Sequence, residues 1–243
     1  MTRRTIADTR LLVTGANRGL GLALVEAALR RGAATVYAGM RTLEPHPDRR
    51  VVPVRLDVTD PTDVAAAAAR IHHLDVLVNN AGVSLPDGLE DRRSLEDHLA
   101  VNLFGLLAVT TAFVPHLTRS RGSVVNVLSL GAIAPVPGLP SYAASKAAAA
   151  SLTQSQRALL AGSGVSVHGV YPGPVDTDMV RALDIPKTPA LQVAEAVLDG
   201  FEAGAEDIFP DPLSASATTG WDQGTVKTLE RANLALFARP AVA

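Results

Sequence analysis

The residues TGANRGLG at positions 14–21 decide the fold of this 243-residue chain. An apolar run at 10–14 precedes them and a helical pattern follows from Leu20, so the glycines occupy a strand-to-helix turn. Glycine at 15, 19 and 21 permits a tight turn and lets the backbone approach a pyrophosphate, which the N–H groups of the helix start would bind. The turn therefore predicts a dinucleotide site, although its G-x-x-x-G-x-G spacing differs from G-x-G-x-x-G. An ordinary strand–helix turn is the alternative.

Short apolar runs alternate with helical patterns along the rest of the chain. The runs lack polar alternation, as expected for parallel strands covered by helices on both faces. We therefore expect residues 1–243 to form a single α/β domain, a Rossmann-like, doubly wound parallel sheet. The predicted strands are 10–14, 35–40, 51–56, 74–79, 123–128 and 165–171, with a short seventh at 207–210. The predicted helices are 20–31, 61–71, 94–117, 141–161 and 189–203.

Three segments depart from this alternation. Residues 42–50, which include Pro45 and Pro47, are too few for a full crossover helix. Residues 176–190 mix apolar and charged side chains after the sixth strand, and we expect them to form a short, mobile substrate lid. The C-terminal tail, 211–243, has no assigned order.

Composition excludes several classes of protein. Hydrophobic residues make up 47% of the chain, there is no cysteine, and the formal net charge is −2. These values exclude a disulfide scaffold and a thiolate site, and they give no basic field for nucleic acid or an anionic membrane. The six histidines form no ligand motif, so we expect no catalytic metal. We expect a soluble, cytoplasmic protein without a membrane span or secretory signal.

Further motifs follow the glycine turn in a fixed order. Asn79-Asn80-Ala81-Gly82 comes after the fourth strand, Ser129 ends the fifth, and Tyr142 with Lys146 forms a Tyr-x-x-x-Lys element thirteen residues on. Pro172-Gly173, with Thr177 beyond, follows the sixth strand. With the turn, these motifs resemble the short-chain dehydrogenase/reductase family over residues 8–185. The shortened segment 42–50 departs from the family pattern and leaves the adenine side of the site undefined.

The resemblance implies hydride transfer between a nicotinamide cofactor and a ketone or alcohol, with Asn102, Ser129, Tyr142 and Lys146 as the catalytic tetrad. It also implies a set of cofactor contacts along the motifs. These are Gly15, Asn17, Arg18, Gly19, Leu20, Gly21, Arg41, Asp57, Val58, Asn79, Ala81, Gly82, Tyr142, Lys146, Pro172, Gly173, Val175 and Thr177.

The residue types suit this chemistry. The alkoxide left by hydride transfer must collect a proton, and a free tyrosine titrates near ~10. Lys146 lies on the same helix face as Tyr142, and its ammonium would lower the pKa of the phenol. Ser129 would donate a hydrogen bond to the carbonyl oxygen. Asn102 interrupts an apolar helix, where the family role is to hold a water that links to the lysine. Bonding between helices is the alternative.

Two arginines favour NADP(H) over NAD(H). Arg41 stands where an NAD-binding fold would place an acid for the ribose hydroxyls, and Arg18 lies within the glycine turn. Guanidinium groups bind a 2′-phosphate through charge-assisted, bidentate hydrogen bonds. Two solvated surface arginines are the alternative, and Glu44 could still hold ribose hydroxyls, as in an NAD-dependent alcohol dehydrogenase.

The segment 130–139 carries no charge, and the resemblance implies that it runs along the substrate site. Together with Met179, Val180 and Leu183 of the lid, this segment favours a neutral, mainly apolar ketone or secondary alcohol. The alternative is that the lid alone selects the substrate, in which case Arg181 or another lid cation could favour anions. The apolar helices 94–117 and 141–161 predict association with a further partner, and the resemblance implies a symmetric homodimer or tetramer.

Two other classes of function compete with the reductase. A nucleotide-binding regulator of the same fold without turnover would not need the intact tetrad. A sugar-nucleotide epimerase or dehydratase would need a longer substrate domain than the residues after Thr177 provide.

Overall fold

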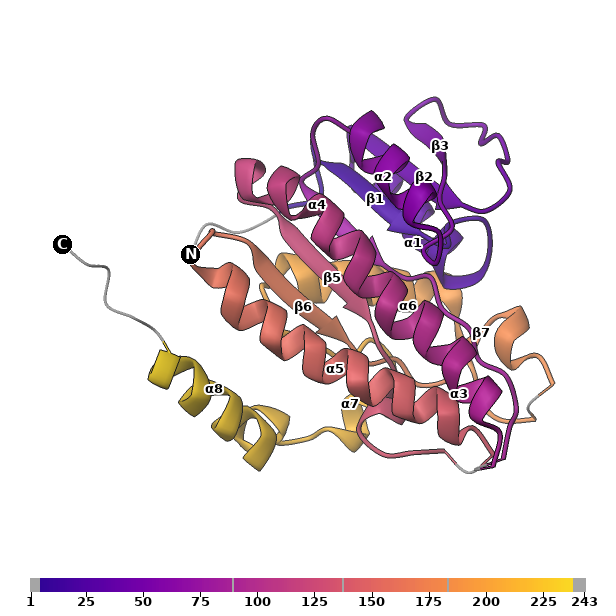
Figure 1. The fold of residues 1–243 in the computed structure, drawn as a ribbon, viewed down its shortest axis with the longest axis vertical. Helices are drawn as coiled ribbons and strands as arrows, with labels where there is room; N and C mark the ends of the chain where they lie inside the picture. Colours follow the sequence, from indigo (N-terminus) through magenta and orange to yellow (C-terminus); the bar gives the residue numbers. More distant parts are fainter. Residues whose placement is uncertain (1–4, 89, 137, 183, 238–243) are drawn as a thin grey trace.

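A single parallel sheet forms the centre of the molecule (Figure 1). The computed structural model describes residues 5–88, 90–136, 138–182 and 184–237. Within them, seven strands pair in the order β3-β2-β1-β4-β5-β6-β9, and the chain changes direction across the sheet between β1 and β4. The predicted doubly wound sheet is confirmed. Its strands are β1 (Arg10–Thr14), β2 (Thr35–Met40), β3 (Val51–Arg55), β4 (Val76–Asn79), β5 (Ser123–Val127), β6 (Ser166–Val170) and β9 (Asp207–Ile208).

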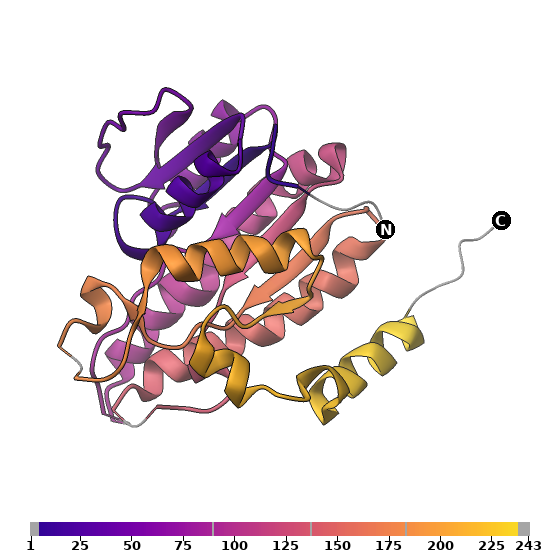
Figure 2. The same cartoon turned by 180° about the vertical axis from the view of Figure 1, so that it is seen from behind.

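Helices cover both faces of the sheet. One face packs against α1 and α6, which Figure 2 shows from behind, and the other packs against α2, α4 and α5. A two-stranded ribbon of β7 (Val175–Asp176) and β8 (Thr188–Pro189) lies beside the sheet. The α-helices are α1 (Gly19–Arg30), α2 (Pro61–Arg70), α3 (Arg92–Leu99), α4 (Leu106–Ser120), α5 (Pro140–Ala161), α6 (Ala190–Glu202), α7 (Pro212–Ala217) and α8 (Thr225–Phe237).

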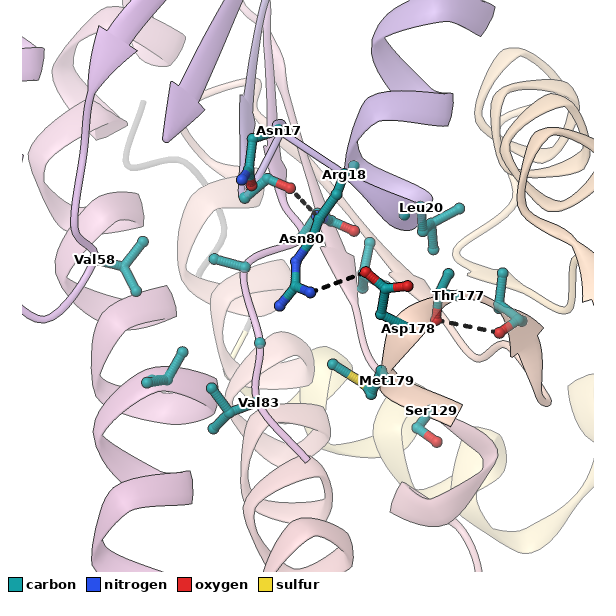
Figure 3. A pocket seen from close by; sticks show the side chains of 18 of the residues that line it. Asn17, Arg18, Leu20, Val58, Asn80, Val83, Ser129, Thr177, Asp178 and Met179 are labelled. Atoms are coloured by element: carbon teal, nitrogen blue, oxygen red, sulfur yellow. Dashed lines mark hydrogen bonds and ion pairs between the residues drawn. The ribbon is translucent and has the colours of Figure 1, made fainter. Parts of the chain in front are cut away.

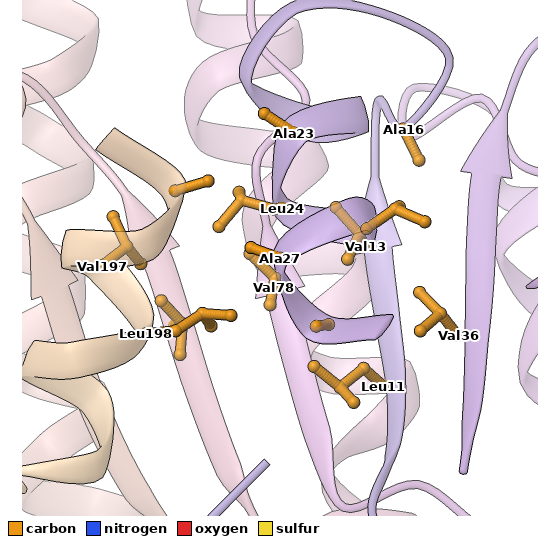
Figure 4. Close-up of a cluster of buried hydrophobic side chains, with 14 of the residues drawn as sticks. Leu11, Val13, Ala16, Ala23, Leu24, Ala27, Val36, Val78, Val197 and Leu198 are labelled. Atoms are coloured by element: carbon orange, nitrogen blue, oxygen red, sulfur yellow. The ribbon is translucent and has the colours of Figure 1, made fainter. Parts of the chain in front are cut away.

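The continuous apolar character of the strands follows from burial on both sides. In β1, Leu11 and Val13 face α1 and α6, where Leu24 and Leu198 complete the cluster (Figure 4). The intervening Leu12 points to the opposite face and joins the cluster of α2 and α4. Leu11, Leu12 and Val13 are at most 1% exposed, so this part of the strand is apolar on both faces.

Residues 41–50 join β2 to β3 without a helix, as expected. The two strands are nevertheless parallel, with Val36 opposite Val51. Arg50 closes the connection, because its guanidinium binds the Asp48 carboxylate at 2.7 Å and the Leu29 carbonyl at 3.1 Å. The strand β3 that follows lies at one edge of the sheet and carries Pro53.

The helix expected at 94–117 is longer than predicted and is not uniform. It runs from Arg92 to Ser120, and a π-helical segment, Ala100–Gly105, separates α3 from α4. By length and composition this helix could span a membrane, but Val109, Phe113 and Leu117 are completely buried against the sheet, as in the core helix of a globular fold. π-Helical segments occur frequently at functional sites, and the segment Ala100–Gly105 contains Asn102.

The described part of the C-terminal tail is ordered into α7 and α8 (yellow in Figure 2); residues 238–243 lie outside the described residues. A buried ionic cluster attaches α8 to the body of the molecule. Lys227 is fully buried and donates to Glu230 at 2.6 Å and to Glu206 at 2.9 Å. Arg157 of α5 binds Asp207 at 2.9 Å and also contacts Glu230. The predicted seventh strand is present but shorter, since β9 ends at Ile208.

Candidate active site

A cleft with a volume of about 310 Å³ opens at the carboxyl ends of the central strands (Figure 3). This is the edge where doubly wound sheets bind their ligands. Most predicted site residues meet there. Those lining the cleft are Gly15, Asn17, Arg18, Gly19, Leu20, Gly21, Arg41, Asp57, Val58, Ala81, Gly82, Ser129, Tyr142, Lys146, Pro172, Gly173, Val175 and Thr177.

The glycine turn forms one end of the cleft. Gly15 and Gly19 have φ of +65° and +56°, a region that favours glycine. A Cβ at Gly21 would lie 2.1 Å from the Gly15 carbonyl oxygen, so only glycine lets α1 start this close to the turn. The start of α1 has no side-chain cap and no acidic residue in its first turn. Its N–H groups and dipole therefore fit an anionic group such as a dinucleotide pyrophosphate.

Tyr142 and Lys146 lie one turn apart on α5, beneath the opposite part of the cleft. The Lys146 ammonium donates to the carbonyl oxygen of Val127, at the end of β5, at 2.9 Å, and lies 5.9 Å from the centroid of the Tyr142 ring. Ser129 follows β5, and its Oγ accepts a hydrogen bond from the Gly131 N–H at 3.0 Å. The structure thus brings three of the four predicted catalytic side chains into the cleft.

Burial shifts both titrating groups. It lowers the pKa of Lys146 from 10.5 to about 8. It also raises the pKa of Tyr142 above 10, and a side-chain hydrogen bond with Ser129 opposes this rise only in part. The expected lowering of the tyrosine pKa by Lys146 is therefore not seen in this structure. The lysine ammonium donates to the Val127 carbonyl, and the loss of solvation of the phenolate raises the tyrosine pKa.

Asn102 lies in the π-helical segment and outside the cleft lining. Its amide donates to the Val83 carbonyl at 3.0 Å and to Ser145 Oγ at 2.9 Å, and its Oδ1 accepts from the Val83 N–H at 2.9 Å. Protein partners therefore engage the whole side-chain amide. The side chain fixes the segment after β4 against α5, which corresponds to the alternative of hydrogen bonding within the protein.

Asn79 is also absent from the cleft. As the last residue of β4 it is buried and donates to Thr110 of α4 at 2.9 Å and to Asn126 of β5 at 2.8 Å. Its neighbour Asn80 lines the cleft instead and donates to the Thr14 and Gly15 carbonyls (Figure 3). The assignment of Asn79 as a cofactor contact does not fit the structure, because side chains alternate along a strand.

The two arginines reach the same cleft in different states. Arg41 follows β2 and is exposed. Arg18 forms an ion pair with Asp178 at 3.1 Å across the cleft (Figure 3), and Asp178 also binds Arg181. The glycine turn is thereby linked to the predicted lid. Both Arg18 and Asp178 are well exposed, so the pair is weak.

The substrate end of the cleft is apolar, but its wall differs from the predicted one. Val83, Val101, Met179 and Val180 line the cleft, whereas none of the described residues of 130–139 does. Ile133 and Val136 are 42% and 47% exposed instead. Pro137 and Leu183, which belong to the predicted wall, lie outside the described residues. The apolar lining at this end therefore comes from the segment after β4, the π-helical segment and residues 179–180.

One histidine was missed as part of the site. His98 is completely buried, accepts a hydrogen bond from the Leu85 N–H at 3.0 Å, and donates from Nδ1 to the Ser94 carbonyl at 2.7 Å. Its ring meets Tyr142 edge-on, with centroids 6.2 Å apart. No sequence motif includes His98, and its contact with Tyr142 depends on the packing of α3 against α5.

Comparison with known proteins agrees with this architecture. A family model described as short chain dehydrogenase matches residues 9–187. The chain is 34% identical over 233 residues to 2-(R)-hydroxypropyl-CoM dehydrogenase of Xanthobacter autotrophicus, covering 82% of this chain and 92% of that protein. It is 37% identical over 190 residues to the 3-oxoacyl-[acyl-carrier-protein] reductase of Thermotoga maritima, covering 71% and 76%.

A solved structure extends the similarity to nearly the full chain. A short chain dehydrogenase from Burkholderia cenocepacia, solved in complex with NADP, is 39% identical and superposes with a TM-score of 0.84. The match covers 95% of this chain and 99% of that one. The chain therefore belongs to the short-chain dehydrogenase/reductase family. It is an oxidoreductase of the class that acts on CH–OH groups.

Proposed function

We propose that the chain is an NADPH-dependent carbonyl reductase, or the same enzyme running as an alcohol dehydrogenase, for neutral and mainly apolar ketones or secondary alcohols. The observation that carries this proposal is the shared cleft. Tyr142, Lys146 and Ser129 lie at one part of it, and an uncapped helix start with Arg18 and Arg41 lies at the other.

The phosphate end supports NADP(H). Arg18 and Arg41 both line the cleft and are exposed, so their guanidinium groups are accessible to an additional phosphate. The related Burkholderia cenocepacia protein was solved with NADP. When bound, the nicotinamide cofactor supplies the hydride for reduction or accepts it in oxidation. Arg18 would exchange its weak contact with Asp178 for the phosphate.

The protein's own groups supply the proton and orient the carbonyl. The phenol of Tyr142 donates its proton to the oxygen of the ketone as that oxygen gains negative charge. The Ser129 hydroxyl donates a hydrogen bond to the same oxygen. The raised pKa of Tyr142 keeps the phenol protonated at neutral pH, which favours proton donation and hence reduction. Lys146, with a pKa of about 8, is the adjacent group that can return a proton to the phenolate.

The apolar lining supports a neutral substrate. Val83, Val101, Met179 and Val180 offer no hydrogen-bond partner from their side chains, so an unpaired charge placed among them would lose solvation without compensation. The two relatives above are named for different substrates, and neither name selects one for this chain. The substrate class proposed here rests on the lining of its own cleft.

A cofactor and ketone panel tests the proposal. The wild-type protein should prefer NADPH over NADH, and kcat/KM should be higher for neutral ketones than for matched ketones bearing a carboxylate or phosphate. Arg41→Asp should weaken NADPH binding by about tenfold to a hundredfold, since a phosphate–guanidinium contact contributes about 1.5–3 kcal/mol. Arg49→Asp is the matched control, because Arg49 is exposed in the same connection and does not line the cleft.

Three results would contradict the proposal. Equal efficiency with both cofactors would remove the NADPH preference, and higher kcat/KM for the anionic ketones would remove the apolar-substrate assignment. If no ketone in the panel supports oxidation of NADPH or NADH, the protein is a nucleotide-binding protein without turnover.

A further inference from the structure

Asp211 is a buried carboxylate in the part of the chain that follows the family match at residues 9–187. It is 5% exposed and precedes α7, where it forms a capping box with Ser214. Its Oδ1 accepts from the Ser214 N–H at 2.9 Å, and its Oδ2 accepts from Ser214 Oγ at 2.8 Å. These bonds fix the carboxylate in one orientation.

The same carboxylate reaches the wall of the cleft. Asp211 Oδ2 accepts a hydrogen bond at 2.7 Å from the N–H of Gly173, which lines the cleft after β6. A Cβ at Gly173 would lie 2.9 Å from Asp211 Oδ1, so the contact requires glycine at that position. The Gly173 peptide is thus held from behind by a residue far along the chain.

The contact continues to a catalytic side chain. The carbonyl of Pro172, next to Gly173, accepts a hydrogen bond from the Leu130 N–H at 3.0 Å. Leu130 directly follows Ser129, whose Oγ is in turn held by the Gly131 N–H at 3.0 Å. A displacement of the Pro172–Gly173 turn would therefore move both the floor of the cleft and Ser129.

We propose that Asp211 is a positioning residue that holds the Pro172–Gly173 turn, and through it Ser129, in the geometry needed for cofactor binding and hydride transfer. Its effect on the cofactor rests on the proposed function, whereas its effect on the turn does not. The acceptor of the Gly173 N–H, Asp211, lies in the C-terminal segment, outside the family match at residues 9–187.

Two variants separate the contact with Gly173 from the helix cap. Asp211→Ser keeps a residue that caps helices as well as aspartate does, but its shorter side chain does not reach the Gly173 N–H. Ser214→Ala has the opposite effect, because it removes the hydroxyl group from the capping box, while the backbone N–H at position 214 still binds Oδ1 and keeps the carboxylate on Gly173. Comparing the two variants therefore separates the loss of the hydrogen bond to Gly173 from the weakening of the cap of α7.

The first measurement is amide hydrogen exchange of Gly173 in the free protein, followed by NMR with labelled glycine. Asp211→Ser should speed this exchange by about tenfold or more, as expected for loss of one hydrogen bond to a charged acceptor. Ser214→Ala should leave it within about twofold of wild type. The second measurement is the NADPH dissociation constant by fluorescence, together with kcat and KM. Asp211→Ser should raise the dissociation constant and lower kcat, while Ser214→Ala changes neither by more than about twofold.

The outcomes separate the two proposals. If Ser214→Ala matches Asp211→Ser in exchange and in binding, Asp211 acts only as a helix cap and the inference is overturned. It is also overturned if Asp211→Ser leaves the exchange of Gly173 unchanged. If the wild-type protein binds neither NADPH nor NADH, the proposed function fails, and the exchange measurement still decides whether Asp211 holds the turn. Should Asp211→Ser fail to fold, the wild-type protein alone decides: the hydrogen bond to Asp211 should slow the exchange of the Gly173 N–H, and exchange as fast as that of an unprotected amide would overturn the inference.

Discussion

Burial of the charged Lys146 side chain lowers the stability of the folded protein. Lys146 is 5% exposed, and burial alone accounts for the fall of its pKa to about 8. A lysine in solution titrates near 10.4, so the folded protein holds the charged form at a disadvantage of roughly 3 kcal/mol. The same disadvantage places the lysine pKa near neutrality, where it can exchange protons with the tyrosine.

This disadvantage predicts a pH-dependent stability. Because the folded pKa lies below the unfolded one, the unfolded chain binds more protons between about pH 8 and 10.5, and the unfolding free energy rises across that window. The penalty is fully present below pH 8. The advantage of Lys146→Met over wild type in urea unfolding should therefore fall by roughly 3 kcal/mol between pH 7 and 10.5. Lys187→Met is the control, and a pH-independent difference for Lys146→Met would contradict the assignment.

Tyr142→Phe tests the proton donor. Removing the hydroxyl while keeping the ring should lower kcat by about 10²–10⁴-fold and leave NADPH binding largely intact. In the wild type, ketone reduction should hold through neutral pH and decline above about pH 8, where Lys146 loses the proton that it returns to Tyr142. The phenol itself stays protonated to higher pH, because burial raises its pKa. Alcohol oxidation, which needs the phenolate, should rise with pH over the same range. Tyr37→Phe is the control, and retention of most activity by Tyr142→Phe would show that another group is the acid.

At the scale of residues, the sequence predicts identities better than orientations. Tyr142 and Lys146 were assigned from spacing, because residues four apart share a helix face. Asn79 and Asn80 could not be separated, since the phase of a strand end depends on where β4 stops. His98 carries no local motif, and the capping box of Asp211 indicates only a helix start. Their contacts with Tyr142 and Gly173 exist only after distant segments pack together.

At the scale of elements, the helix from Arg92 to Ser120 combines two tasks. Its second half is a core helix, and its π-helical segment directs Asn102 to the backbone of Val83 and to Ser145. The apolar pattern predicts the helix but not the change of helical type, because a π segment of six residues is too short to show a period of its own. The C-terminal helices were not assigned for a related reason: α8 is anchored by buried charges rather than by an apolar stripe.

Asn102→Leu should therefore destabilise the protein and loosen one wall of the cleft. It removes three hydrogen bonds and leaves both polar groups of the Val83 backbone without this partner, a loss of about 2–4 kcal/mol in unfolding free energy. Because Val83 lines the cleft, KM for the ketone should also rise. Ser145→Ala removes one of the three bonds and should cost about 1 kcal/mol. Equal losses in the two variants, measured by chemical denaturation, would argue against this role.

At the scale of the whole molecule, exposed apolar side chains on the outer helices predict association. Phe104 and Leu107 are 58% and 40% exposed beside an apolar groove between α2 and α4, and Leu159 of α5 is 79% exposed. A symmetric homodimer or tetramer would cover these surfaces. Light scattering at micromolar concentration should give a multiple of the 25.3 kDa chain mass, and Phe104→Asp should reduce it. Leu43→Asp, at an exposed position outside these helices, should not; a monomeric wild type would refute the prediction.

The alternation of strands and helices was sufficient to predict the sheet. The strand β1 is apolar on both sides, as Leu11 and Leu12 illustrate, and only a sheet between two helical layers buries such a strand. The short connection at 41–50 was also foreseen from its length and prolines. Its closure by Arg50 was not, since the Leu29 carbonyl that it binds belongs to α1.

Pro53 in β3 has a consequence for colloidal behaviour. The Arg50 carbonyl and the Leu56 N–H both face β2, so alternate residues place Pro53 on the outer side of this terminal strand. Proline has no N–H there, and the Val51 N–H is already bound to the Asp48 carbonyl at 3.0 Å. The open margin of the sheet is thus left with few donors that could recruit a strand from another molecule, and no hydrogen bond within the sheet is lost. Pro53 and the hydrogen bond between Val51 and Asp48 therefore both reduce the capacity of this valine-rich edge to add a strand from another molecule.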